Sequence, residues 1–88
     1  MRYPIVVDRG DETHAHGVVI PDLPGCFSAG DTLEEAFENA KEAAEGWIEC
    51  ELEDGRAIPE PSSMEEVAAL EEFKDWMVGS IDVEVPGK

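Results

Sequence analysis

The sequence predicts an α+β domain, in which a three- to four-stranded antiparallel sheet carries one long helix and one short helix. Short runs of alternating apolar and polar residues lie near both ends of the chain, and two segments with helical apolar spacing lie between them. With 88 residues, 42% of them hydrophobic, the chain has the size and composition of one small globular domain, residues 1–88.

Four segments have the alternation or apolar character of strands. In residues 2–8 the apolar side chains at positions 3, 5 and 7 share one side, and Pro4 is tolerated only at a strand start or on an edge. Residues 16–20 follow a polar connection and suggest a hairpin with a long loop. Residues 26–29 predict a short third strand, and residues 80–85 alternate regularly, as a strand with one buried and one wet face does.

The segment "PDLPGCFSAG", residues 21–30, leads from the second strand through a turn and the short third strand to the long helix. Its prolines and glycines are typical of a tight connection, so we interpret it mainly as scaffold. We expect Gly25 and Gly30 to supply positive φ, and Asp22 to make a side-chain hydrogen bond within the turn.

The long helix has signals at both ends. Asp31 is the expected N-cap, with Glu34 three residues later in the capping-box position, and Gly55 is the expected C′ residue. The apolar stripe between them indicates a helix packed on a sheet; it consists of Leu33, Ala36, Phe37, Ala40, Ala44, Trp47 and Ile48.

A second, shorter helix is predicted after the proline-containing link. Ser63 is its expected N-cap, with Glu66 three residues later, and the helical segment covers residues 64–73. The link between the two helices contains "IPEPSS", which is typical of an extended, stiff connection.

The net charge narrows the choice of partners. Twenty-two acidic residues against six basic ones leave −16, which repels nucleic-acid phosphates and anionic lipids and favours a basic protein or a cation. The alternative is that the acidity serves only solubility or reflects a salt-adapted source.

There is no apolar run long enough to span a bilayer and no signal peptide, so a cytoplasmic location is expected. Cys26 and Cys50 are interpreted as small apolar fillers.

The long helix carries acids where they repel one another. Like-charged pairs four residues apart lower its stability by about 1–2 kcal/mol in sum. Two interpretations remain open: a solvated face screened by salt, or a surface shaped for a basic partner. The acids beyond the first turn that face away from the apolar stripe are Glu38, Glu42, Glu45 and Glu49.

Patterns for metal binding or catalysis are weak. His14 and His16 have the spacing of two ligands on one strand face, without a third ligand nearby in the sequence. Four carboxylates could in principle converge on a divalent metal, as in nucleases; they are Asp8, Asp22, Asp31 and Glu35. We expect no bound metal, no cofactor and no catalytic residues.

The segment "VVIPDLPGCFSAGDTLEEAFENAKEAAEGWIE", followed by "DGRAIPEPSS", closely resembles the HicB family of antitoxins from toxin–antitoxin pairs. The resemblance covers about residues 3–85. It implies a partial ribonuclease-H-like fold that acts as the toxin-neutralising domain and is not an enzyme. The implied partner is HicA, a small basic toxin that cleaves messenger RNA with a histidine and whose active site the antitoxin covers.

The resemblance also sets expectations for assembly. Many members continue into a DNA-binding domain, whereas this sequence stops after the last predicted strand, so operator binding is not expected of these residues. A homodimer or higher oligomer is expected.

Charge, rather than the family motif, suggests the toxin-binding residues: Asp22, Glu38, Glu42, Glu45 and Glu49. Two other functions stay open, a metal-dependent nuclease-like enzyme on the same sheet and an orphan protein-interaction module.

Overall fold

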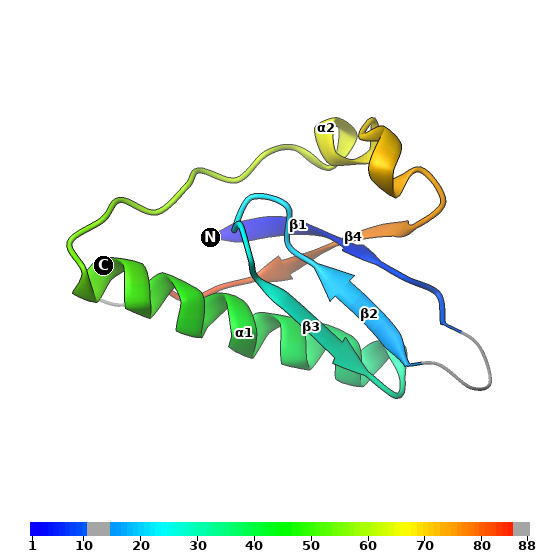
Figure 1. Cartoon of the computed structure of the whole chain (residues 1–88), viewed down its shortest axis with the longest axis horizontal. Coiled ribbons are helices and arrows are strands. Elements are labelled where there is room, and N and C mark those ends of the chain that lie inside the picture. The colour runs from blue at the N-terminus through cyan, green and yellow to red at the C-terminus, as the bar shows by residue number, and fades with distance from the viewer. Residues whose placement is uncertain (11–14, 86–88) are drawn as a thin grey trace.

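The computed structural model describes residues 1–10 and 15–85, and within them it contains a four-stranded antiparallel sheet with strand order β3-β2-β1-β4 (Figure 1). The predicted α+β class, with one long and one short helix, is confirmed. The elements are β1 (Arg2–Val7), β2 (His16–Val19), β3 (Phe27–Gly30), α1 (Leu33–Glu53), α2 (Met64–Ala68), the short 3₁₀ helix η1 (Glu71–Phe73) and β4 (Met77–Asp82).

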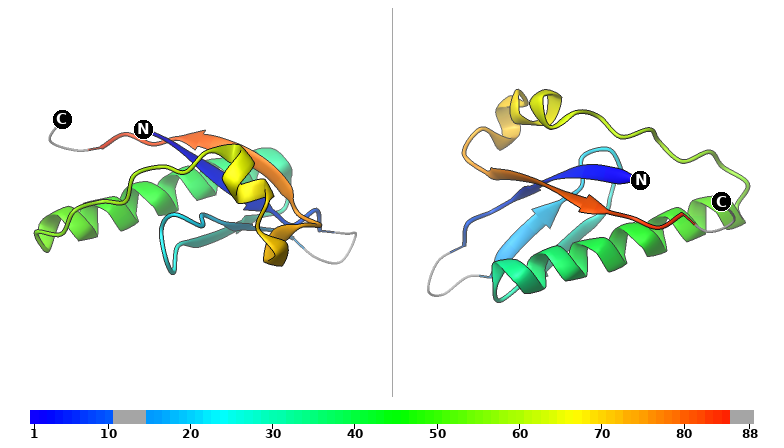
Figure 2. Two further views of the ribbon diagram at one scale, coloured as in Figure 1. Left: turned by 90° about the horizontal axis from the view of Figure 1, so that it is seen from above. Right: turned by 180° about the vertical axis from the view of Figure 1, so that it is seen from behind.

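Strand β1 is buried on both faces. Its residues Tyr3, Ile5 and Val7 belong to the main core, which they share with the inner side of α1. The view from behind in Figure 2 shows α1 running across this face of the sheet. Val6 points to the opposite face and is also fully buried, where α2 packs on β1 and β4 with Val67 inward.

Pro4 lies in β1, which is central in the strand order, but at Pro4 this strand pairs with β4 alone, so the position is an edge on its other side, as expected. Met1 and Val83 exchange both main-chain hydrogen bonds, at 2.8 and 2.7 Å. Because such pairs alternate along an antiparallel ladder, the Pro4–Ser80 pair exchanges none, and the nitrogen of Pro4 points away from β4. β2 pairs only with the last two residues of β1, so no ladder hydrogen bond is lost there.

The caps of α1 differ from the prediction at one end. The N-cap is Thr32, one residue later than expected, and its hydroxyl accepts from the Glu35 amide at 3.1 Å. Both Asp and Thr are favourable caps, so local chemistry alone does not choose between them. At the other end Gly55 is at C′ with φ of 76°, as predicted. The bonds from the Gly55 and Arg56 amides to Leu52 and Glu51 complete a Schellman motif.

The start of α1 lies directly against the end of β3. A Cβ added to Gly30 would lie 2.4 Å from the Ala36 nitrogen, so only glycine fits there. Gly30 does not have positive φ, which corrects the prediction, and its function is close approach rather than a left-handed turn. Gly25 does have positive φ, at 79°.

In the C-terminal part of the chain, the bounds of the helix and the strand differ from the predicted ones. The expected helix over 64–73 stops at Ala68, because Leu70 adopts an extended conformation and the chain turns into η1 before entering β4. Strand β4 begins three residues earlier than expected and ends at Asp82, although the Met1–Val83 main-chain bonds continue the pairing. Ile81 and Val83 are buried, which agrees with the alternation of buried and wet residues predicted for residues 80–85.

Candidate partner-binding surface

The structure separates the predicted contact residues into two groups. Glu38, Glu42 and Glu49 are exposed on α1 and point away from the sheet. Glu45 lies on the same helix but is half-buried, and its Oε2 accepts from the Glu84 amide at 3.0 Å. This carboxylate therefore also fixes the chain that leaves β4.

Asp22 serves a structural purpose. It is half-buried, and its two oxygens accept from the Ser62 amide at 2.8 Å and the Ser62 hydroxyl at 2.6 Å. The prediction of a bond within its own turn was therefore wrong: the partner lies 40 residues away, in the link between α1 and α2. The segments "PDLPGC" and "IPEPSS", which the resemblance treated as separate motifs, meet at this contact.

Tyr3 extends the same contact to the sheet. Its hydroxyl donates to the Pro59 carbonyl in the link. Burial raises the pKa of Tyr3, and the negative charge of Asp22 raises it further. The link is thus held at two points, by Tyr3 from β1 and by Asp22 from the turn.

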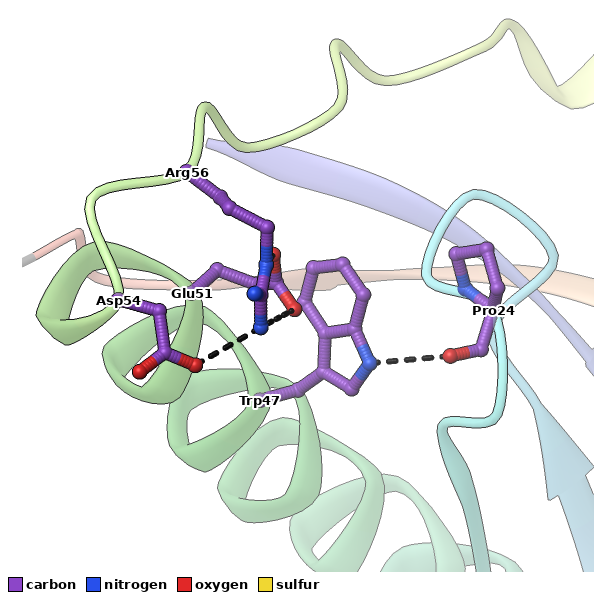
Figure 3. A network of polar contacts seen from close by, with 5 residues as sticks. All are labelled: Pro24, Trp47, Glu51, Asp54 and Arg56. Atoms are coloured by element: carbon purple, nitrogen blue, oxygen red, sulfur yellow. Dashed lines mark hydrogen bonds and ion pairs between the residues drawn. The ribbon is translucent and has the colours of Figure 1, made fainter.

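The turn is also bound to the C-terminal half of α1 (Figure 3). The indole N–H of Trp47 donates to the Pro24 carbonyl at 3.0 Å. One turn further along, Arg56 pairs with Glu51 at 2.6 Å and Asp54 at 2.8 Å. These ion pairs are exposed and contribute little to stability, whereas the Trp47 bond fixes a large ring beside the turn.

An open depression lies between the turn, the beginning of β3 and the outward side of α1. Its volume is about 290 Å³. Phe27 borders it and is 65% exposed, although it is a large apolar residue. The remaining lining residues are mostly small or apolar: Gly25, Cys26, Ala43, Gly46, Trp47, Cys50 and Glu51. The sequence interpretation missed this surface; the signal that could have revealed it is a glycine within a long helix, at Gly46.

A second, larger hollow of about 700 Å³ lies at the β4 edge. It is lined by charges of both signs, from Lys41, Asp82 and Glu84, together with apolar side chains. Arg2 pairs with Asp82 nearby at 3.0 Å, and the guanidinium lowers the pKa of that carboxyl. This hollow lacks the single charge sign that would favour a basic partner.

The described residues include no group of three or more His, Cys, Asp or Glu side chains arranged to hold a metal ion. Of the four carboxylates considered above, Asp22 accepts hydrogen bonds from Ser62, and Glu35 accepts from the Asp31 amide at 3.5 Å. A ring nitrogen of His16 lies 3.2 Å from the Asp8 carbonyl oxygen, and His14 lies outside the described residues. Within the same part of the chain, no helix has the length and apolarity needed to cross a membrane.

Comparison with known proteins identifies the family to which this small α+β domain belongs. Residues 3–87 match the model of the HicB_like antitoxin of bacterial toxin–antitoxin systems. The chain belongs to this family.

Three known proteins illustrate the relationship. The N-terminal domain of the Burkholderia pseudomallei antitoxin HicB is 31% identical with a TM-score of 0.82, over 97% of this chain and 100% of that one. A chain in the HicA3 and HicB3 toxin–antitoxin complex is 26% identical with a TM-score of 0.79, over 96% of this chain and 99% of that one. An uncharacterized 14.9 kDa protein of Haemophilus phage HP1 is 44% identical over 85 residues, which are 97% of this chain but only 62% of that protein.

Proposed function

We propose that this domain is an antitoxin that binds a small basic HicA-type toxin and neutralises it by covering the active site that cleaves messenger RNA. The observation that carries the proposal is the family match over residues 3–87. The fold it shares with a chain of the HicA3 and HicB3 complex supports a toxin as the partner.

The charge of the chain suits such a partner. A ribonuclease has to present a positive surface to hold the RNA backbone, and a protein of net charge −16 is attracted to the same surface. Opposite charges accelerate the encounter and select this partner over neutral ones. Carboxylates that occupy the toxin's cationic groups exclude RNA phosphates by direct competition.

Within this proposal, the exposed acids of α1 are the first contacts with the toxin. Glu38, Glu42 and Glu49 are accessible, and each has a carboxylate four residues away, a repulsion that is relieved when a cationic surface covers them. Glu45 and Asp22, the other predicted contact residues, already hold hydrogen bonds within the domain. We expect them to contribute less to binding than the three exposed glutamates.

The experiment measures, by calorimetry, the binding of a HicA-type toxin in a catalytically inactive form. Combined substitution of Glu38, Glu42 and Glu49 by Lys should weaken binding by roughly 100-fold at low salt. The salt dependence of the affinity should fall as well.

The matched control replaces three exposed acids elsewhere, Glu65, Glu71 and Glu72, by Lys. It changes the net charge equally but leaves α1 intact, so it should weaken binding much less. Equal losses in both variants would mean that net charge, and not this helix face, governs the encounter. Co-expression tests neutralisation itself: full lethality of the active toxin in the presence of the folded wild-type domain would contradict the proposal.

A further inference from the structure

Gly46 lies inside α1 for no reason that the domain itself supplies. A Cβ added there would meet no atom within 4 Å, and the residue does not have positive φ. Gly30 and Gly79 are different, because added Cβ atoms there would approach neighbouring atoms at 2.4 and 3.2 Å. Since glycine within a helix lowers stability relative to alanine, an outward glycine without internal need suggests that the space above it is used by another molecule.

The space above Gly46 is part of the depression described above. Ala43 and Cys50 lie one turn before and after it, and Trp47 forms a wall whose indole N–H is already bound to the Pro24 carbonyl. The ring is therefore held in place before any partner arrives. A preformed apolar hollow of this kind suits an apolar side chain that enters from outside.

Carboxylates flank this hollow on its outer side. Glu42 precedes Gly46 by four residues and Glu49 follows it by three, so both lie within one turn of it on the helix surface, and both are exposed. A second copy of this chain would bring another net charge of −16 to the same place. A basic protein is instead attracted to it.

We propose that the hollow over Gly46 receives an apolar side chain of the toxin, flanked by Lys or Arg side chains that pair with Glu42 and Glu49. This inference rests on the proposed function and specifies its interface: the glutamates orient the toxin, and the hollow supplies the central desolvated contact. It also assigns a role to a glycine that the fold does not require.

The test fills the hollow without harming the helix. Gly46→Leu and Gly46→Ala should both raise the thermal unfolding midpoint or leave it unchanged. The added Cβ meets no neighbouring atom, the rest of the leucine side chain enters the hollow, and both residues favour the helix over glycine. Binding of the inactive toxin should weaken by roughly tenfold or more for Gly46→Leu and less for Gly46→Ala. Cys50→Lys, which adds a positive charge to the lining of the hollow, should also weaken binding by roughly tenfold.

Ala68, exposed on α2 and outside the hollow, provides the matched controls Ala68→Leu and Ala68→Lys. Both should bind the toxin like the wild type. Wild-type affinity in folded Gly46→Leu and Cys50→Lys would overturn the inference while leaving the antitoxin function intact. Absence of binding by the wild type would instead refute the proposed function itself. Sedimentation of each variant alone covers the remaining case: loss of self-association with unchanged toxin affinity would make the hollow a contact between copies of this chain and would also overturn the inference.

Discussion

Two regions of the domain differ in how their polar and small residues are used. One is the cluster in which the turn contacts the link between α1 and α2, and the other is the outward face of α1. In the cluster, Asp22 and Tyr3 each have a defined bonding partner within the domain. On the outward face, Glu42 and Glu49 are exposed close to other carboxylates, and Gly46 leaves space above the helix. The first arrangement stabilises the domain. The second lowers its stability, because like charges repel one another and glycine disfavours the helix. This contrast is the reason that we propose the outward face of α1, and not the cluster, as the toxin-binding surface.

Gly30, which lies against the start of α1, and Gly46, which lies inside α1, give the sharpest contrast in stability. Gly30→Ala should lower the free energy of unfolding by about 3 kcal/mol, because the new Cβ would overlap backbone atoms that cannot move aside. Gly46→Ala should raise it by about 0.5–1 kcal/mol through helix propensity alone. Urea unfolding of both variants measures the difference. A stable Gly30→Ala domain would mean that β3 and α1 are not pressed together as described.

Asp22→Ala should have the next largest effect. It leaves the Ser62 amide and hydroxyl without their acceptors, which should lower the free energy of unfolding by about 1–2 kcal/mol. Ser62→Ala removes only one of the two bonds and should cost about half as much. Toxin affinity should change little in both variants under conditions where they are folded. A loss of affinity without a loss of stability would transfer Asp22 from the structural region to the interface, as its charge first suggested.

How much of this could be predicted from the sequence depends on the distance over which each feature acts. Gly55 and Ser63 were predicted correctly because helix caps depend on a few neighbouring residues. Alternation placed Ile81 on the inner face, but it does not reveal which strands are neighbours, so the central position of β1 was not foreseen.

The candidate site was predicted only in part, for the same physical reason. Spacing along a helix identified the exposed Glu38, Glu42 and Glu49. It could not show that Asp22 bonds to Ser62 or that Glu45 bonds to the Glu84 amide, since these contacts join segments about 40 residues apart. The space over Gly46 depends on the position of the turn beside α1, which no local pattern specifies.

Tyr3→Phe tests the contact between the link and the sheet, and it carries a pH dependence. Loss of the bond to the Pro59 carbonyl should lower the free energy of unfolding by about 1 kcal/mol at neutral pH. The pKa of Tyr3 is raised above its ordinary 10.0 in the folded domain. Its contribution is therefore fully present below pH 10 and is lost as the pH rises further, because the unfolded chain releases the proton first.

Tyr3 is the single tyrosine of the chain, so the variant isolates this effect. Unfolding curves recorded between about pH 8 and 11 should show a steeper alkaline decline for the wild type than for Tyr3→Phe. Parallel pH profiles would contradict a buried, bonded hydroxyl at this position.

Glu42→Gln should cause the smallest change in stability. It should make the domain slightly more stable while weakening toxin binding. Glu42→Gln keeps the shape of the side chain and removes the charge repulsion between Glu42 and Glu38, four residues earlier. The free energy of unfolding should therefore rise by about 0.2–0.5 kcal/mol. Toxin affinity should fall, and the affinity should become less sensitive to salt. Glu66→Gln, exposed on α2, is the matched control, and its toxin affinity should not change. Simultaneous gain of stability and loss of affinity at Glu42 would show directly that the acidic face is maintained for its partner. A gain of stability with unchanged affinity would reduce that face to a solvated surface.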